Sequence, residues 1–326
     1  MILSIQFTRF LAALFIVFMH SILEYESTFR VGDFGVDIFF ILSGFIISYI
    51  TEGNRHKFLT RRLIRIVPIY WLFTFVISLL VFLLPDLFMS TVWDTQHMLK
   101  SLFFLPGTQD QGYLPIIKLG WTLNLEMIFY ILFFLSMKFS HEYRELITSL
   151  IIILIILTLQ KLELDGAYAI NFYSSPLSLE FIYGMMLAKT WHRHKFKNSL
   201  KISISLATIS IAILIFFNNY TQVGEYRFIF YGIPSLILVY SFLSVEHYFT
   251  NLNTSFQKII LWFGEMSYPL YLIHIFLVGL ISRVIFSEIE LWALFPIVLA
   301  SSLLLSNVVT ANFDRPLRRF LNSLYL

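Results

Sequence analysis

The chain has 326 residues, of which 58% are hydrophobic and only 13% are charged, and its formal net charge at pH 7 is +3. A soluble domain has about 45–50% apolar and about 25% charged residues, so this composition indicates an integral membrane protein. The small net charge gives no support for a nucleic-acid partner. Cysteine is absent, which excludes disulfides, thiolate catalysis and cysteine-ligated metals.

Apolar segments follow one another along the whole chain. A helix needs about 20 residues to cross the hydrocarbon core. Ten segments approach that length: 5–24, 34–51, 67–85, 121–139, 145–161, 175–191, 199–217, 227–245, 262–283 and 291–311. With no internal repeat or linker between them, we expect an all-α, polytopic membrane protein. About ten transmembrane helices would form one bundle and a single domain over residues 1–326.

Lysine and arginine are distributed unevenly over the two sides of this topology. Sixteen of the 23 fall on the side of both chain ends and six on the opposite side, with Arg9 inside the first segment. Cytoplasmic loops carry the excess of basic residues, so both termini are predicted to be cytoplasmic. We therefore expect a multi-pass membrane protein in contact with membrane lipid, with its basic loops in the cytoplasm.

Four ionisable residues, Arg9, His20, Asp37 and Glu126, lie in the apolar segments. Such residues are costly within a membrane and usually face a protein interior or a polar cavity. Arg9 and His20 are eleven residues apart, which is about 16 Å along a helix and within ~20° of one face. The predicted topology puts His20, Asp37 and Glu126 at one depth, in the outer half of the membrane.

A histidine at this depth is suited to general-base catalysis. An imidazole can take a proton near neutral pH, and a carboxylate on its other nitrogen would hold its tautomer. We predict that His20 is a catalytic base that activates a hydroxyl, and that Asp37 or Glu126 orients it or binds the acceptor. The alternative is a structural hydrogen bond from His20 to a backbone carbonyl.

The arginine-rich segment with Arg61, Arg62 and Arg65 has two interpretations. It is typical of an interfacial helix on anionic lipids, and it would also suit a clamp for a phosphorylated donor, because arginine binds phosphate bidentately. The Ser43–Gly44 pair likewise permits either close helix packing or the passage of a thin ligand between helices.

We place Trp121, Tyr268 and His274 as candidates for binding the substrate. For His274 a structural hydrogen bond across the bundle is an equal alternative. The sequence contains no HExxH, CxxC or P-loop pattern, so neither a metal nor nucleotide hydrolysis is expected.

Six motifs occur in order along nearly the whole chain, and together they resemble one family. They are Arg9–His20, Gly35–Ile46, Arg61–Trp71, Trp121–Tyr130, Gly264–His274 and Asp314–Leu317. The chain resembles the membrane-bound acyltransferase family 3, which includes bacterial O-antigen and exopolysaccharide O-acetyltransferases. One departure is Asp314, where the family often has glutamate.

The resemblance implies transfer of an acyl group, acetyl by default, from cytoplasmic acetyl-CoA to a hydroxyl of a carbohydrate or glycolipid acceptor. It implies that Arg9 and His20 form the essential pair and that the arginine-rich segment is associated with the donor. We expect the arm of the donor to pass Arg9, Ser43 and Gly44. It further implies a location in the bacterial cytoplasmic (inner) membrane, and a homodimer is compatible with this reading.

Two other functions are compatible with the same composition. Intramembrane histidine, arginine and carboxylates also suit a proton-coupled transporter or flippase of a glycan or lipid precursor. Inverted repeats and paired broken helices would favour a transporter, and the sequence shows neither. A structural subunit of a secretion complex would leave the polar residues without a role. Thioester consumption by purified protein distinguishes the three functions.

Overall fold

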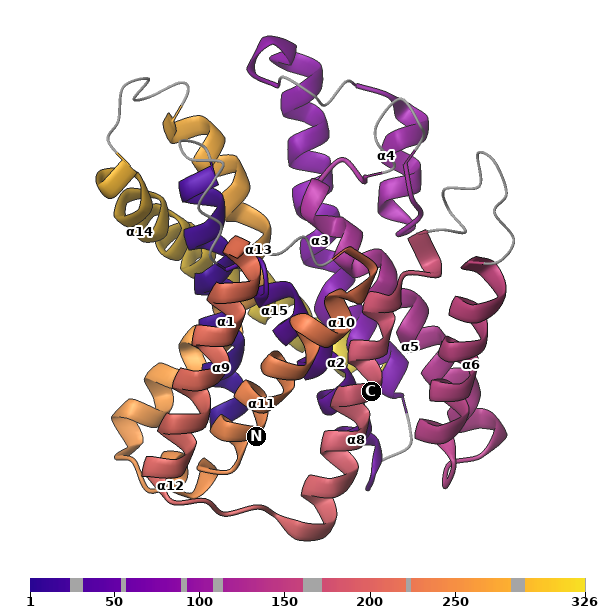
Figure 1. Cartoon of the computed structure of the whole chain (residues 1–326). Helices are drawn as coiled ribbons and strands as arrows, with labels where there is room; N and C mark the ends of the chain where they lie inside the picture. The colour runs from indigo at the N-terminus through magenta and orange to yellow at the C-terminus, as the bar shows by residue number, and fades with distance from the viewer. Residues whose placement is uncertain are drawn as a thin grey trace. The chain divides into compact units, whose positions relative to one another are not determined.

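The structure is a computed structural model, and it describes residues 1–23, 32–53, 57–88, 93–107, 114–160, 172–220, 224–282 and 291–325. Throughout these ranges the regular elements are helices (Figure 1). The α-helices are α1 (Leu3–Leu23), α2 (Gly35–Thr51), α3 (Phe58–Leu83), α4 (Thr95–Leu102), α5 (Trp121–Phe139), α6 (Arg144–Leu159), α8 (Leu179–His194), α9 (Leu200–Tyr220), α10 (Arg227–Phe230), α11 (Gly232–Leu243), α12 (Glu246–Thr250), α13 (Thr254–Leu280), α14 (Leu291–Val309) and α15 (Arg315–Tyr325). The 3₁₀ helix η3 (Lys118–Gly120) precedes α5, and the π-helix η8 (Thr310–Asp314) joins α14 to α15.

Each of the ten predicted segments overlaps at least one helix. Within the described ranges, seven stretches are long and apolar enough to cross a membrane, and α2 is a shorter apolar helix. The all-helical, multi-pass character is thus confirmed, whereas the count of ten spans and the cytoplasmic position of the termini stay predictions. Segment 227–245 is divided at Tyr231, between α10 and α11. Pro234 has no N–H to bond the carbonyl at the end of α10.

The chain forms two compact units that are interleaved in sequence. The first unit comprises Met1–Asn54 and Leu179–Thr310, and the second comprises Arg55–Ser178 and Ala311–Leu326. The first therefore contains α1, α2 and α8–α14, and the second contains α3–α6 and α15. The single domain expected from the sequence remains a prediction.

Helix α1 is the central element of the first unit, and it packs against α2, α11, α13 and α14. Its N-terminus is capped by a residue far away in sequence: Leu3 and Ser4 donate their backbone N–H groups to the Glu246 carboxylate, at 2.8 and 2.7 Å. A carboxylate at this end satisfies free N–H groups and interacts favourably with the helix dipole.

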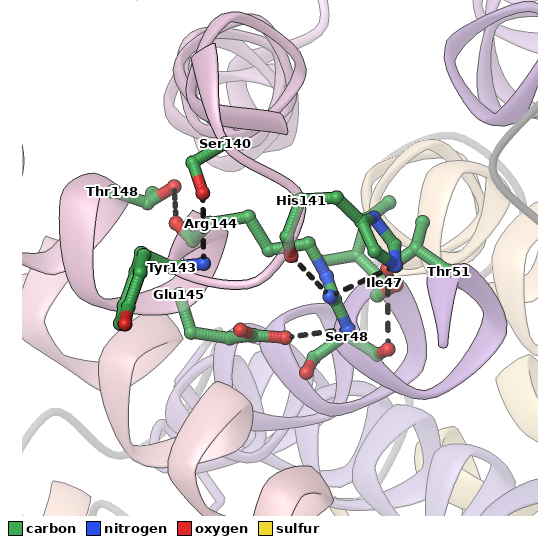
Figure 2. Close-up of polar contacts among 9 residues, drawn as sticks. All are labelled: Ile47, Ser48, Thr51, Ser140, His141, Tyr143, Arg144, Glu145 and Thr148. Atoms are coloured by element: carbon green, nitrogen blue, oxygen red, sulfur yellow. Dashed lines mark hydrogen bonds and ion pairs between the residues drawn. The ribbon is translucent and has the colours of Figure 1, made fainter. Parts of the chain in front are cut away.

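Helix α2 ends at Thr51, whose hydroxyl donates to the backbone carbonyl of Ile47 one turn earlier (Figure 2).

Helices α2 and α8 pack in backbone contact. A Cβ atom on Gly44 would lie 2.1 Å from the carbonyl oxygen of Phe181, and one on Gly184 would lie 2.0 Å from that of Ile41. Small residues permit this approach, as is usual between membrane helices. Close packing is therefore what Gly44 does in this structure, and the passage of a ligand at Ser43 and Gly44 stays a prediction.

In the second unit α3 packs against α4, α5 and α15, and α5 packs against α6. The turn from α5 to α6 contains a buried ion pair, in which Arg144 Nη2 lies 2.9 Å from Glu145 Oε1 (Figure 2). Arg144 also donates to the His141 carbonyl at 2.6 Å. These bonds fix the angle at which α6 leaves the turn.

The short helix α4 is held against α3. Asp94 caps α4 by accepting the N–H of His97 at 2.7 Å, and the Trp71 indole N–H donates to the Leu102 carbonyl at 2.8 Å. The His97 ring nitrogen Nε2 lies 2.8 Å from the Leu114 carbonyl. Burial lowers the pKa of His97 below its ordinary value, although this hydrogen bond acts in the opposite direction. Burial therefore favours the neutral ring.

We expect Gly44→Ala to destabilise the protein strongly, because the new methyl group would meet the backbone of α8. Overpacking of this kind typically costs about 1–3 kcal/mol. Gly279→Ala is the matched control, since nothing lies within 4 Å of a Cβ at Gly279. It should leave thermal unfolding in detergent unchanged or raise its midpoint, because alanine favours a helix by up to about 1 kcal/mol over glycine. Equal midpoints for Gly44→Ala and the parent would contradict the α2–α8 contact.

Candidate active site

Two histidines from helices far apart in sequence meet in the first unit. His274 Nε2 lies 3.2 Å from His20 Nδ1, and the ring centroids are 5.1 Å apart. His20 is on α1 and is partly exposed, whereas His274 is on α13 and has no exposed surface. The packing of α13 on α1 brings the rings together, and Gly264 of α13 lies directly against Gln6 of α1.

The hydrogen bonds define the neutral tautomer of each ring. His20 Nδ1 lies 2.9 Å from the Ile16 carbonyl, and His274 Nδ1 lies 3.1 Å from the Leu270 carbonyl. A carbonyl oxygen only accepts, so in both neutral rings the proton is on Nδ1. His274 Nε2 is then an acceptor for the shared N–H of His20. This arrangement puts the lone pair of His20 on Nε2, where it is available to take a proton.

Arg227, the first residue of α10, binds two aspartates at the start of α2. Its Nε and Nη2 atoms donate to the two carboxylate oxygens of Asp37, at 3.0 and 2.6 Å. Its Nη1 atom donates to Asp33 at 2.5 Å, and Nη2 also donates to the Asp33 carbonyl at 3.0 Å. Asp37 has no exposed surface, while the side chains of Asp33 and Arg227 are 35% and 22% exposed. The network thus extends from the interior to an accessible edge.

A third carboxyl group completes this network. Glu180, on α8, is fully buried and lies against Asp37. Its side chain is also 3.1 Å from the position of a Cβ on Gly232. Helices α2, α8 and α10 therefore meet at one polar cluster, which we call the Arg227 network (Asp33, Asp37, Glu180 and Arg227).

The Arg227 network lies at the end of α1 that carries His20. The charge of Asp33 acts on the His20 ring, and Gly35 at the start of α2 is in contact with the backbone of Ala12. Asp37 was expected to orient His20, but its oxygens are bonded to Arg227, and His274 is the residue bonded to His20 Nδ1. The catalytic role of Asp37 stays a prediction.

Sequence reasoning missed Glu180, Arg227 and Asp33. Glu180 and Arg227 each lie in or at the edge of an apolar segment, and the rule that identified Asp37 applies to them equally. Arg227 was instead counted as a loop residue for topology. Asp33 gave no such signal, because it precedes its helix.

The second unit contains the other candidates. Tyr130 donates its hydroxyl hydrogen to Glu126, one turn earlier on α5, and the Arg62 guanidinium lies 5.7 Å from the centre of the Tyr130 ring. Arg65 interacts electrostatically with Arg62, with Tyr130 and with the pair Asp314–Arg318, whose atoms are 2.7 Å apart. Three guanidinium groups thus gather around two carboxylates, which leaves an excess of positive charge. We call Arg62, Arg65 and Arg318 the basic cluster.

The remaining predicted residues lie on the expected helices. Arg9 is buried on α1, 3.5 Å from Gln6, and Arg61 is exposed on α3. Ser43, Trp121 and Tyr268 are partly buried on α2, α5 and α13. The position of Glu126 relative to His20 stays a prediction, since they belong to different units. Among the described residues no group of three or more His, Asp or Glu is arranged to hold a metal ion.

A family model described as an acyltransferase domain matches residues 2–311. The chain is 30% identical to the exopolysaccharide production protein ExoZ of Rhizobium meliloti, over 78% of this chain and 79% of that protein. It is 26% identical to a "Putative O-acetyltransferase" of Staphylococcus aureus and 25% identical to the "Putative peptidoglycan O-acetyltransferase YrhL" of Bacillus subtilis.

The match to the Staphylococcus aureus protein covers 74% of this chain and 45% of that protein, and the match to YrhL covers 78% of this chain and 46% of that protein. The chain thus spans about half the length of these two relatives. No solved structure matches the chain. The match over nearly the whole length shows that the chain belongs to the acyltransferase family 3, as the six motifs indicated.

We expect Arg227→Met to lower the midpoint of thermal unfolding markedly, because Asp37 would stay buried without its cation. Removing one partner of a buried ion pair costs about 3–5 kcal/mol. The double variant Asp37→Leu/Arg227→Met removes both charges and should recover most of the loss. Arg193→Met, at an exposed position of α8, is the control. A double variant no more stable than Arg227→Met would contradict the direct pairing.

Proposed function

We propose that the chain transfers an acetyl group from cytoplasmic acetyl-CoA to a hydroxyl of a carbohydrate acceptor at or across the bacterial inner membrane, with His20 as the general base. Membership of the acyltransferase family supports an acyl donor and the transfer reaction. The hydrogen-bonded His20–His274 pair is the observation that carries the assignment of the base.

The basic cluster supports coenzyme A as the donor. Arg62, Arg65 and Arg318 leave an uncompensated positive charge, and the Nε atoms of Arg62 and Arg318 form no hydrogen bond with any described residue. Guanidinium groups bind phosphate oxygens in a planar, bidentate geometry. The phosphates of coenzyme A would compensate this charge, and we assign them to the basic cluster.

His20 would act on the acceptor through Nε2. As the acceptor oxygen attacks the carbonyl carbon of the thioester, Nε2 takes the hydroxyl proton. The carbon–sulfur bond then breaks, and the same proton passes from Nε2 to the departing sulfur, which leaves as a thiol. General-base assistance of this kind contributes about 10²–10⁴-fold to a rate. No covalent acyl-enzyme is needed.

His274 would hold His20 in the tautomer that this reaction requires. By accepting the Nδ1–H of His20, it stabilises the form with the lone pair on Nε2, and it would share the positive charge as His20 becomes protonated. The accessible edge of the Arg227 network, with Asp33, lies near this histidine and offers carboxylate acceptors for sugar hydroxyls.

The acceptor class follows from the relatives. One is named for exopolysaccharide production and another for peptidoglycan O-acetylation, and both names point to a carbohydrate outside the cytoplasm. We propose an extracytoplasmic glycan or its lipid-linked precursor. Mass spectrometry of surface glycans from deletion and wild-type cells should show a loss of about 42 Da for each missing acetyl group, since acetylation is a covalent modification.

We expect His20→Ala to lower acetyl transfer by about 10²–10⁴-fold while leaving acetyl-CoA binding intact, because only the proton-accepting group is removed. Release of the CoA thiol by purified protein, with a glycan acceptor present, measures the transfer. His194→Ala, at an exposed position of α8, is the matched control and should match the parent. Full activity of His20→Ala would exclude His20 as the base, and the absence of thioester consumption by the parent would favour a transporter.

We expect His274→Leu to lower kcat by about 10-fold or more, with little change in KM for acetyl-CoA, because the Nδ1–H of His20 loses its side-chain partner and keeps only the Ile16 carbonyl. For metal-bound histidines the loss of an orienting partner costs about 10–100-fold in activity, and we expect an effect of the same order here. His274→Gln should restore part of kcat, because its amide oxygen can accept the same hydrogen bond. Equal kcat values for the two variants would show that His274 has only a packing role.

A further inference from the structure

Asn124 is a buried side chain whose hydrogen-bonding groups are not satisfied. It is 1% exposed, and neither its Nδ2 nor its Oδ1 atom forms a hydrogen bond with any described residue. A buried amide without partners costs free energy, and nearly all such groups in folded proteins are paired with protein, water or ligand. Asn124 therefore indicates that something else bonds to this position when the protein works.

The contacts between α3 and α5 define where Asn124 lies. At one end Arg62 of α3 faces Tyr130 of α5, and at the other Tyr70 of α3 lies 2.8 Å from the position of a Cβ on Gly120. The two helices run in opposite directions between these contacts. Asn124 is one turn from Gly120 on the same face, and side chains tilt toward the N-terminus of their helix. We therefore expect its amide on the side of α5 that faces the part of α3 containing Tyr70.

The depth of Asn124 relates it to the basic cluster. Asn124 and Tyr130 are six residues apart on α5, which is about 9 Å along the helix axis. The basic cluster, around Arg62 and Tyr130, would hold the phosphates of the donor. One to two helical turns deeper, an unpaired amide offers one donor group and one acceptor group. Another amide is the natural complement of this pair.

We propose that Asn124 binds an amide of the pantetheine arm of coenzyme A, as the arm leaves the basic cluster and runs between α3 and α5. The inference deepens the proposed function and rests on its assignment of the donor. The arm carries two secondary amides, each with one N–H and one C=O, beyond its diphosphate. Asn124 Nδ2 donates to the carbonyl of one of these amides, and Oδ1 accepts its N–H. The passage of the arm at Arg9, Ser43 and Gly44 stays a prediction.

The test compares two ligands that differ in the arm. Coenzyme A contains it, and adenosine 3′,5′-diphosphate lacks the arm and one of the three phosphates but keeps the nucleoside and the other two phosphates. Binding of each to the purified full chain is measured by calorimetry, without any acyl transfer. Asn124→Leu should raise the Kd for coenzyme A about tenfold, the effect of losing one or two hydrogen bonds, and leave the Kd for the diphosphate unchanged. Arg65→Gln should raise the Kd for both ligands.

Ser136→Ala is the control on the same helix, since Ser136 is buried and bonded to the Leu132 carbonyl. It should alter neither Kd. The unfolding midpoint of ligand-free Asn124→Leu should equal or exceed that of the parent, because an unpaired buried amide is removed. Asn124→Ala should give the same changes in Kd and midpoint, and its smaller side chain cannot clash with the surrounding residues.

Unchanged Kd values for coenzyme A in both Asn124 variants would overturn the inference. An equal rise in the Kd values for coenzyme A and for adenosine 3′,5′-diphosphate would also overturn it. A large fall in the ligand-free midpoint of both variants would also overturn it, because the amide would then be structural. If the parent binds neither ligand, the donor assignment of the proposed function fails as well. If the parent binds coenzyme A and both Asn124 variants bind it with the same Kd, only the role of Asn124 is excluded.

Discussion

A charge buried in an apolar chain must be compensated within the protein, and the first unit is organised around that requirement. The Arg227 guanidinium makes two hydrogen bonds to the carboxylate of Asp37, which has no exposed surface, and binds Asp33 beside it. The Asp37 carboxylate would be prohibitively costly alone in a low-dielectric interior. Pairing therefore determines where α10 begins relative to α2, and the buried carboxyl group of Glu180 on α8 lies against Asp37.

Glycine packing and the ion network act together on α1. Gly35 lets α2 approach the backbone of α1, and Gly44 lets α8 approach the backbone of α2. Glu246 fixes the opposite end of α1 by capping its first N–H groups. The helix that carries His20 is thus held at both ends, and His274 is presented to it from a second long helix. A base on packed helices keeps its geometry better than one on a loop.

In the second unit, by contrast, buried polar groups and charges are not fully compensated by the described residues. Its arginines outnumber the carboxylates around them, and Asn124 has hydrogen-bonding groups that no described residue satisfies. A stable core would not retain either feature without a reason, and such exceptions to local rules concentrate at functional sites. The π-helix between α14 and α15 belongs to the same region, because it ends at Asp314, which pairs with Arg318. Single-turn π-helices often occur at functional sites.

The sequence by itself determined the class of protein, the approximate helices and the positions of Arg9, His20, Asp37 and Glu126. These properties are local, because apolar length and isolated charges can be recognised without knowledge of any partner. Only the tertiary structure decided which residues these side chains bond to. His20 meets His274 across 254 residues, and Asp37 meets Arg227 across 190. Pairing at such separation depends on how helices pack, which hydropathy does not encode, since all faces of these helices are largely apolar.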